Sequence, residues 1–391
     1  MITVDEFAQE AKQWLAENKH LAPRDYGAIC PPDMVNEGLS WQKHLYASGK
    51  AGIHWPVEFG GQGLTAAHQA QWLYECALVG VPGVFNMVGL VLTGGAVQKF
   101  GTPEQQAKHL NATLRADHVW CQLFSEPGAG SDLGSLSTKA ERDGDRYIVN
   151  GQKVWCSGGR YSNWGILMAR TNADAPKHEG ISFLLFSMDS PGVSVKPIEL
   201  LNGHSPFCQT FFDDVQVPKI DLIHKENQGW RVATRLLQHE RSGLASLASA
   251  DKAGPLQRIK PSMPLPDLAK HYAGADVIAD AVLRDEIVVN EMQKRAFNLT
   301  QARAVAESEA DTPGAATSIF NYIEAEYVKD QLELQNRIRG TQAFGWEGDS
   351  FTSEEIGMCR LNLEAKSISI AGGSNEIQLN IIAKRVLGLP D

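Results

Sequence analysis

The sequence of 391 residues lacks the motifs that mark several common enzyme classes. No GxxxxGK[ST], HExxH or GxSxG string is present, which excludes P-loop, zinc-protease and serine-hydrolase chemistry. The six cysteines are widely separated and form no Cys-x-x-Cys pair, so we expect a reducing compartment and neither a disulfide scaffold nor a zinc site. Low-complexity tracts are absent and charged residues make up 21% of the chain, which argues against disorder.

The sequence also lacks an excess of positive charge. It has 36 basic and 46 acidic residues, a net charge of −10, which argues against a general binder of nucleic acid or of anionic membranes. A local basic pocket for an anionic ligand stays open. The N-terminal stretch carries Asp5, Glu6 and Glu10, unlike a secretory or mitochondrial presequence, and we expect a cytoplasmic protein.

One uncharged run, residues 76–97, is 22 residues long and would be long enough to span a bilayer. It contains Pro82, Asn86 and five glycines, which interrupt a membrane helix. We therefore predict two buried helical pieces joined by a Gly/Pro turn, and no membrane span.

Apolar residues make up 43% of the chain, and their spacing changes twice along it. Helical spacing in the first part, together with a Thr-Pro-Glu cap at residue 102, predicts helices at 5–18, 40–50, 66–80 and from 103 onward. Strand spacing follows, and helical spacing then returns. We expect an α+β chain of three domains: a helical domain over 1–117, a β-domain over 118–227 and a helical bundle over 228–391.

The β-domain is predicted from alternating residues and turn signals. Asp143-Gly144 and Asn150-Gly151 are each expected to close a tight hairpin, because both dipeptides supply the positive φ that such turns need. The expected strands are 119–125, 139–141, 146–149, 153–155, 166–169, 181–186, 193–198 and 207–212. Residues 128–134 are similar to a dinucleotide-binding loop, but hairpin strands follow them and no βαβ unit is present.

The C-terminal part is predicted to be almost wholly helical. The expected helices are 229–251, about 265–308, 315–339, 353–371 and a last one to about 386.

Five short motifs occur in the order in which one enzyme family carries them. They are FGGQG (59–63), FSEPGAGSD (124–132), GQKVWCSGG (151–159), NQGW (227–230) and IAGGSNEIQ (370–378). Together they resemble the motifs of the acyl-CoA dehydrogenase family. The resemblance implies an antiparallel β-domain, barrel or sandwich, between a helical domain and a four-helix bundle.

The resemblance also implies an activity in lipid degradation and fatty acid metabolism. Such an enzyme uses FAD to desaturate an acyl-CoA thioester between Cα and Cβ: a base takes the α-proton while hydride passes from Cβ to flavin N5. The family passes the electrons to an electron-transfer flavoprotein and is usually tetrameric.

Site residues follow from the same resemblance. Ser125 and Ser157 match hydroxyls that hydrogen-bond the isoalloxazine ring, Trp155 matches an indole that packs beside it, and Ser131 matches a contact to the thioester and phosphopantetheine. The further FAD contacts are assigned to Gln122, Phe124, Gln342, Ser374 and Glu376. An alternative for Trp155 is an aromatic residue of the β-domain core.

The base is the main departure from the family pattern. Most members carry a glutamate where this chain has Gly372, and glycine cannot remove a proton. A minority carry the base on the first helix of the C-terminal bundle, and Glu240 matches that position. Arg241 then matches a residue that shapes the thioester pocket and Gln238 one that contacts pantetheine.

The helix around Glu240 supports this assignment independently. Glu240 lies in an apolar stripe and has no basic residue three or four positions away, so a surface ion pair is weakly supported. A carboxylate on an apolar face has a raised pKa, which suits a general base near neutral pH. The alternative is a structural glutamate bonded to Arg241 or to a distant residue.

Gly372 has two further implications. Its backbone N–H, with a flavin ribityl hydroxyl, would polarise the thioester carbonyl, as in the family. The missing side chain leaves room beside Cα and Cβ, flanked by Ile370 and Ala371, so we expect a branched, long or bulky acyl group.

A second departure concerns FAD. The family usually carries Arg-x-x-Phe-Gly early in the bundle, and residues 255–275 hold nothing like it. Residues 342–348 only partly resemble the adenine-side motif. One alternative is therefore a subunit of a heteromeric enzyme that shares a flavin site with a different chain instead of a homotetramer. A second alternative that stays open is a flavin oxidase or monooxygenase on the same fold that acts on something other than a CoA ester.

Overall fold

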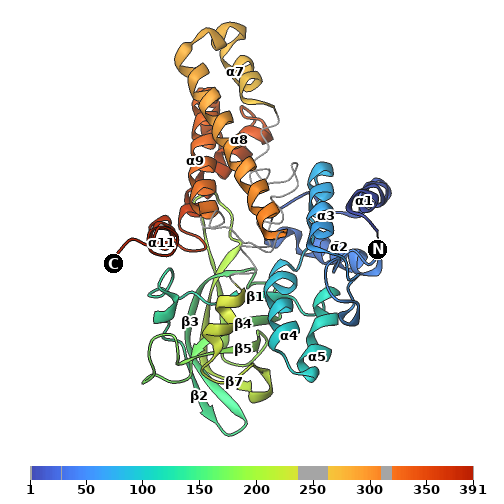
Figure 1. Cartoon of the computed structure of the whole chain (residues 1–391), viewed down its shortest axis with the longest axis vertical. Helices are drawn as coiled ribbons and strands as arrows, with labels where there is room; N and C mark the ends of the chain where they lie inside the picture. The colour runs from blue at the N-terminus through green and yellow to red at the C-terminus, as the bar shows by residue number, and fades with distance from the viewer. Residues whose placement is uncertain (1, 28, 237–262, 310–318, 391) are drawn as a thin grey trace. The chain divides into compact units, whose positions relative to one another are not determined.

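The computed structural model describes residues 2–27, 29–236, 263–309 and 319–390. The chain divides into two compact units, one formed by Met1–Glu199 with Ser205–Gly243 and the other by Leu200–His204 with Leu244–Asp391 (Figure 1). The first unit holds the N-terminal helices and the β-sheet, and the second holds the C-terminal helices. The three-domain bounds 1–117, 118–227 and 228–391 stay a prediction.

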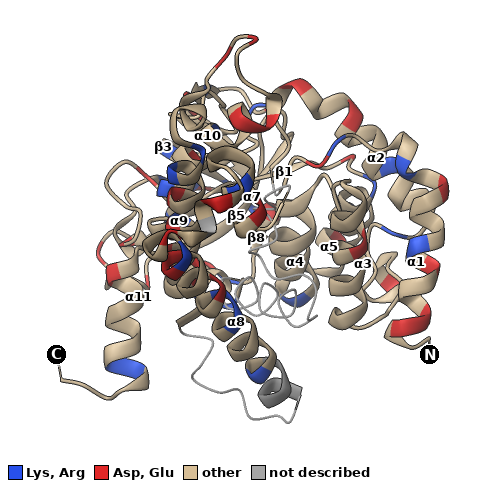
Figure 2. Cartoon of the chain, turned by 90° about the horizontal axis from the view of Figure 1, so that it is seen from above, with Lys and Arg blue, Asp and Glu red and all other residues tan. Residues whose placement is uncertain are grey.

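The first unit begins with five α-helices whose positions follow the predicted helical spacing. They are α1 (Val4–Asn18), α2 (Val35–Ala47), α3 (Ala66–Val79), α4 (Gly94–Phe100) and α5 (Pro103–Leu114). A capping box starts α1 at Thr3 and α5 at Thr102, where the threonine side chain and a Glu or Gln three residues later satisfy backbone N–H groups. Acidic and basic residues are interspersed along α1 (Figure 2).

The uncharged run 76–97 folds as predicted, into helical pieces with a turn between them. Helix α3 ends at Val79, Gly80 takes the left-handed conformation with φ +74°, and a π-helical segment, Val88–Thr93, leads into α4. In the part of the chain that the structure describes, no helix is long and apolar enough to cross a membrane.

The β-domain is one mixed sheet, in the order β6-β7-β3-β2-β4-β5-β8, with β1 pairing to β4. Its strands are β1 (Trp120–Leu123), β2 (Lys139–Asp143), β3 (Arg146–Ser157), β4 (Trp164–Arg170), β5 (Ile181–Ser187), β6 (Val193–Ile198), β7 (Phe207–Pro218) and β8 (Leu222–Ile223). Pairings β1–β4 and β2–β4 are parallel, and the other pairings are antiparallel. The sheet does not close into a barrel, and a sandwich describes it.

Both faces of the central strands are buried. Along β4, Ile166 packs with the N-terminal helices while its neighbour Leu167 packs inside the β-domain. In β5 the same alternation places Phe183 with the helices and Leu184 inside the β-domain. The sheet therefore separates two apolar layers, of which one is covered by helices.

A buried polar network joins the helices to the sheet. The Asn86 side chain donates to the carbonyl groups of Thr113 (3.0 Å) and His118 (2.7 Å) and accepts from the backbone N–H of Trp120 (3.1 Å). Gln42 of α2 accepts from the N–H of Phe85 (2.8 Å), next to Asn86. These amides satisfy backbone groups where the helical segment ends and β1 begins.

The hairpin predicted at Asp143-Gly144 is confirmed, and the one at Asn150-Gly151 is wrong. Strand β3 continues straight through Asn150. The irregularity lies on β7 instead, where Asp213 and Asp214 face the single residue Asn150. Asn150 and Asp214 exchange two hydrogen bonds of 2.9 Å, so the turn-forming asparagine pairs across the sheet.

The second unit is helical, with one break that the sequence did not predict. Its helices are α7 (Leu265–Ala273), α8 (Ala281–Glu309), α9 (Phe320–Arg339), α10 (Ser353–Ala365) and α11 (Asn375–Ile381). The single helix expected over 265–308 is wrong: α7 ends at Gly274, with φ +95°, and Asp280 accepts from the N–H of Val282 (2.8 Å) at the start of α8.

The remaining helix predictions for the C-terminal part agree where they can be compared. Residues 229–236 are helical, and the rest of the predicted helix 229–251 lies outside the described residues. Helix α10 ends earlier than predicted and continues as a short 3-10 turn, Lys366–Ser369. Arg337 of α9 pairs with Glu286 of α8, and both helices carry acidic and basic residues (Figure 2).

Two histidines are packed together beside the Asn86 network. The Nδ1 atoms of His109 and His118 are 3.1 Å apart, and both rings lie against Trp120 and Trp164. Burial, with the nearby positive charge of Lys108, lowers the pKa of His109 to about 3. Near neutral pH the folded chain therefore holds His109 uncharged, and burial also lowers the pKa of His118.

This pair predicts acid sensitivity. Because the pKa of His109 falls from 6.5 to about 3 on folding, the unfolded chain binds more protons between these pH values, and stability drops as pH falls through that window. We expect His109→Gln to flatten the fall in the free energy of unfolding between pH 6.5 and 4, by up to about 1.4 kcal/mol per pH unit, which denaturant unfolding at each pH measures. The exposed His20→Gln variant is the control, and equal slopes in both variants would contradict the prediction.

Candidate functional site

The candidate site in the first unit lies where the end of β1 meets β3. Ser125 follows β1 directly, and its carbonyl accepts a hydrogen bond of 2.9 Å from the N–H of Val154. This bond places the backbone of Ser125 beside the residue that precedes Trp155. The two motifs 124–132 and 151–159, which are separate in the sequence, thus meet in the structure.

Trp155 is presented by a β-bulge. Val154 and Trp155 of β3 face the single residue Gln209 of β7, and Trp155 has φ +61°. Its side chain is 53% exposed and lies edge-on to Phe207, with ring centroids 6.0 Å apart. The indole is therefore not part of the β-domain core, and a bulky residue is held in a costly left-handed conformation.

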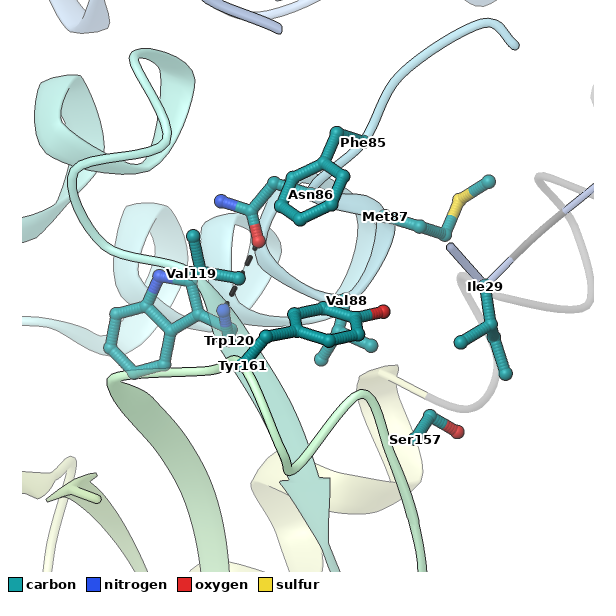
Figure 3. Close-up of a pocket in the computed structure, with 9 residues that line it drawn as sticks. All are labelled: Ile29, Phe85, Asn86, Met87, Val88, Val119, Trp120, Ser157 and Tyr161. Carbon is teal, nitrogen blue, oxygen red and sulfur yellow. Dashed lines mark hydrogen bonds between the residues drawn. The ribbon is translucent and has the colours of Figure 1, made fainter. Parts of the chain in front are cut away.

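Ser157, two residues after Trp155, borders a small recess between the sheet and the N-terminal helices. The recess is lined by Ile29, Phe85, Asn86, Met87, Val88, Val119, Trp120, Ser157 and Tyr161 (Figure 3). Among the residues that the structure describes, none forms a hydrogen bond with the hydroxyl of Ser125 or of Ser157. Both are half-buried, so each hydroxyl is available to a ligand.

The other two predicted FAD contacts in this region, Gln122 in β1 and Phe124 just after it, differ from each other in burial. Phe124 is buried, with its ring edge-on to Phe183 at 5.8 Å, so its backbone rather than its ring is available to a ligand. Gln122 lies in β1 and is half-buried.

Ser131 lies in an exposed loop whose shape is fixed by neighbouring side chains. Arg170, at the end of β4, donates to the carbonyl groups of Gly134 (2.7 Å) and Lys177 (3.0 Å). Asp132, next to Ser131, forms an ion pair of 2.5 Å with Lys177. These contacts hold the loop that carries the predicted thioester contact against the neighbouring loop around Lys177.

A buried ion pair, Lys153 with Glu126, underlies these elements and was not predicted from the sequence. The Lys153 ammonium lies 2.8 Å from Oε1 of Glu126 and donates to the carbonyl of Phe124 at 2.9 Å, and its side chain is 0% exposed. Oε1 of Glu126 also accepts from the N–H of Thr138 (2.8 Å), and Oε2 accepts from the N–H (2.7 Å) and hydroxyl (2.8 Å) of Ser137.

The contacts of this pair keep both groups charged. Burial by itself would raise the pKa of Glu126, but the Lys153 ammonium and the hydrogen bonds outweigh it and lower this pKa well below its usual range. Burial lowers the pKa of Lys153, and the carboxylate opposes that shift. The sequence signal that could have indicated this pair was one glutamate in the motif 124–132 and one lysine in the motif 151–159.

In the second unit, the predicted site residues surround a glycine turn before α11. Gly372 and Gly373 have φ +70° and +99°. The Gln378 side chain donates to the carbonyl of Gly372 (3.2 Å) and that of Asn321 donates to the carbonyl of Gly373 (3.3 Å). A Cβ added to Gly372 would meet nothing nearer than Oδ1 of Asn321 at 4.0 Å, so there is space but an unfavourable backbone for a side chain.

The remaining predicted contacts in this unit have different surroundings. Ser374 is the N-cap residue of α11, and Glu376 is exposed in its first turn, where its own backbone N–H and the Ser374 hydroxyl hold the pKa of Glu376 below its usual range. Gln342 lies in the 3-10 segment Gly340–Phe344, and its Oε1 is buried with no hydrogen-bond partner in the described structure. Gln238, Glu240 and Arg241 lie outside the described residues.

The donor set fits a flavin nucleotide. The first unit offers two half-buried hydroxyls and an exposed indole near the ends of β1 and β3. Hydroxyls and an indole suit the polar edge and the flat face of an isoalloxazine ring. Ser125, Trp155 and Ser157 would hold the ring.

Comparison with known proteins gives matches along the whole chain. The sequence matches the N-terminal domain of acyl-CoA dehydrogenase over residues 4–117, the middle domain over 121–215 and the C-terminal domain over 227–387. Acyl-CoA dehydrogenase IpdE1 of Mycolicibacterium smegmatis is 35% identical over 100% of this chain and 99% of its own length. Acyl-CoA dehydrogenase IpdE1 of Mycobacterium tuberculosis is 34% identical over the same shares.

Solved structures are similar over the whole chain as well. The steroid ACAD Tcur3481-Tcur3483 is 27% identical with a TM-score of 0.82, covering 99% of this chain and 97% of its own. The ChsE4-ChsE5 complex from Mycobacterium tuberculosis is 25% identical with a TM-score of 0.78, covering 100% of this chain and 99% of its own.

The fold and the β-domain site define a flavin-dependent oxidoreductase with helical, sheet and helical parts in that order. The chain belongs to the acyl-CoA dehydrogenase family. Acyl-CoA dehydrogenases are FAD-dependent, so FAD is its cofactor.

The bulge at Trp155 generates a test of the site geometry. Alanine at this position keeps the left-handed strain, which costs about 1–2 kcal/mol, whereas glycine removes it. We expect Trp155→Gly to melt at a higher temperature than Trp155→Ala, although both variants lose the indole. Thermal unfolding of the two FAD-free variants measures this, and a higher melting temperature for the alanine variant would contradict the positive φ.

Proposed function

We propose that this chain catalyses the FAD-dependent α,β-dehydrogenation of an acyl-CoA thioester with a bulky acyl group, and that Glu240 is the base. Family membership over the full length supports the reaction class. The observation that carries the choice of base is Gly372, which stands where most members of the family have a glutamate.

The proton step needs a carboxylate close to Cα. Glu240 takes the α-proton and becomes a carboxylic acid, while the bond to hydrogen at Cβ breaks and its electron pair leaves with the hydrogen as hydride. FAD supplies the hydride acceptor at N5 of its isoalloxazine ring. In the sequence Glu240 stands among apolar residues at helical spacing, and a carboxylate in apolar surroundings can accept a proton near neutral pH.

The Gly372 turn contributes its backbone. The side chains of Gln378 and Asn321 donate to the carbonyl groups of Gly372 and Gly373. These bonds fix the turn although neither glycine has a side chain of its own. The N–H of Gly372 donates to the thioester carbonyl, which stabilises the enolate-like charge that forms when the α-proton leaves. A preorganised donor of this kind acts without reorganising during the reaction.

The acyl group is the second part of the proposal. Gly372 leaves the space of a glutamate side chain open, and its neighbour Ile370 is 66% exposed. Apolar surface beside an open space favours a wide, rigid acyl group over a short straight chain. The similar structure described as a steroid ACAD supports a polycyclic acyl group of this kind.

In the proposed site, Ser125 and Ser157 hydrogen-bond the flavin ring and Trp155 packs beside it. Ser131 contacts the pantetheine end of the substrate, together with Gln238 and Arg241. An electron-transfer flavoprotein is the proposed acceptor of the electrons.

A heteromeric enzyme is the second candidate. Residues 255–275 hold no Arg-x-x-Phe-Gly motif, which the family uses to reach the flavin pyrophosphate across a subunit interface. The similar ChsE4-ChsE5 structure is a complex of two named chains. In this proposal a different chain supplies the missing contact and the two chains share one flavin site.

Glu240→Gln tests the base. The amide keeps the size of the side chain but cannot accept the proton, so we expect anaerobic reduction of the flavin by the acyl-CoA to slow at least about 100-fold with flavin still bound. Stopped-flow absorbance of the oxidised flavin measures this rate. Glu179→Gln, an exposed carboxylate in the first unit, is the control; near wild-type reduction by both variants would assign the base elsewhere.

Flavin content tests the assembly. If the chain completes its own site, the protein produced alone binds about one FAD per chain, and FAD raises its melting temperature. If a second chain is required, we expect well below one FAD per chain and full occupancy only on co-expression. Visible absorbance against protein concentration gives the ratio. Rapid oxygen consumption by a protein whose flavin acyl-CoAs do not bleach anaerobically would instead favour the flavin oxidase or monooxygenase.

A further inference from the structure

The loop that carries Ser131 is closed at both ends by one carboxylate. Glu126 precedes the loop 127–136, and its two oxygens accept from the backbone N–H groups of Ser137 and Thr138, which follow it. Within the loop, Glu126 and Ala129 exchange backbone hydrogen bonds of 2.9 and 3.0 Å. The position of Glu126 therefore fixes where the loop leaves the sheet and where it returns.

The ammonium of Lys153 fixes Glu126 in turn. Lys153 lies in β3 immediately before the two bulged residues Val154 and Trp155. Its ammonium donates to Glu126 and to the carbonyl of Phe124. The next residue, Val154, donates to the carbonyl of Ser125. Two consecutive residues of β3 thus hold two consecutive peptide groups at the end of β1.

The contact with Phe124 also has an electrostatic effect. A carbonyl that accepts a hydrogen bond from an ammonium polarises its own peptide group, which strengthens donation by the N–H of that peptide. This N–H belongs to Ser125. The buried charge of Lys153 thereby strengthens hydrogen-bond donation by the N–H of Ser125, although the Lys153 side chain is 0% exposed and contacts no ligand.

From these contacts we propose that the Lys153–Glu126 ion pair is a positioning element that sets, through the Phe124–Ser125 peptide, the Trp155 bulge and the Ser131 loop, the geometry of the flavin and pantetheine contacts. The proposal rests on the assignment of these contacts in the proposed function. It makes Lys153 and Glu126 positioning residues, which touch neither FAD nor substrate.

The first test uses Lys153→Met, Glu126→Gln and Lys153→Arg in the full chain, with its partner chain if FAD binding requires one. We expect both neutral variants to shift the visible absorption maximum of bound FAD and to weaken FAD binding at least tenfold. Lys153→Arg keeps the positive charge and should retain most of the wild-type spectrum. Lys139→Met, an exposed lysine of β2, is the control.

A second readout needs no flavin. Hydrogen exchange followed by mass spectrometry should show faster exchange in Lys153→Met for peptides covering 124–138 and 151–158, and unchanged exchange in α1–α3. Faster exchange throughout the unit, or a wild-type flavin spectrum and affinity in both neutral variants, would overturn the proposal, since the pair would then contribute only to overall stability.

If a single variant fails to fold, the double variant Lys153→Met with Glu126→Leu replaces it in the test. Replacing both partners of a buried ion pair by apolar residues usually restores the fold that one unpaired charge destabilises. We expect this variant to fold and still show the altered flavin spectrum; a wild-type spectrum would overturn the proposal. No readout uses an acyl-CoA, so failure of wild-type flavin reduction by substrate would count against the proposed function alone.

Discussion

A lysine ammonium with no access to solvent is the constraint on which the site in the β-domain depends. Moving two charges out of water costs several kcal/mol per ion, and the mutual attraction of Lys153 and Glu126 offsets this only because every oxygen of the carboxylate is hydrogen-bonded. Leaving either partner alone would cost about 3–5 kcal/mol. The pair therefore tolerates one arrangement of the surrounding backbone, which is the arrangement that presents Ser125 and Trp155.

The sheet can support such a site because it is held from both sides. The alternation of Ile166 and Leu167 between two apolar layers fixes the register of β4, since a shift by one residue would exchange the layers. Asn86 and Gln42 then satisfy the backbone where the helical part runs into β1. Strand β1 is thus anchored at its start by buried amides and just beyond its end by an ion pair.

Much of the fold could be predicted from local spacing, because helix caps and strand alternation are local signals. The exceptions involve contacts distant in sequence: Asn150 pairs with Asp214 instead of turning, and Lys153 meets Glu126 across the sheet. The break at Gly274 was not predicted because the helical spacing of apolar residues continues on both sides of it. Motifs located Ser125, Trp155 and Ser157, but only the three-dimensional pairing shows that Ser125 is hydrogen-bonded to the bulge that presents Trp155. Glu240 remains a prediction.

The two irregularities between β3 and β7 lie on opposite strands, with two residues of β7 against Asn150 and two residues of β3 against Gln209. Each displaces the pairing by one residue, in opposite directions, so the ladder returns to its original register. A single-residue deletion at either place would leave the offset uncompensated and turn Cys156 or Tyr147 out of the core. Insertions and deletions should therefore be accepted here only in pairs, one on each strand. A single insertion or deletion cannot remove the bulge at Trp155 without disrupting the sheet.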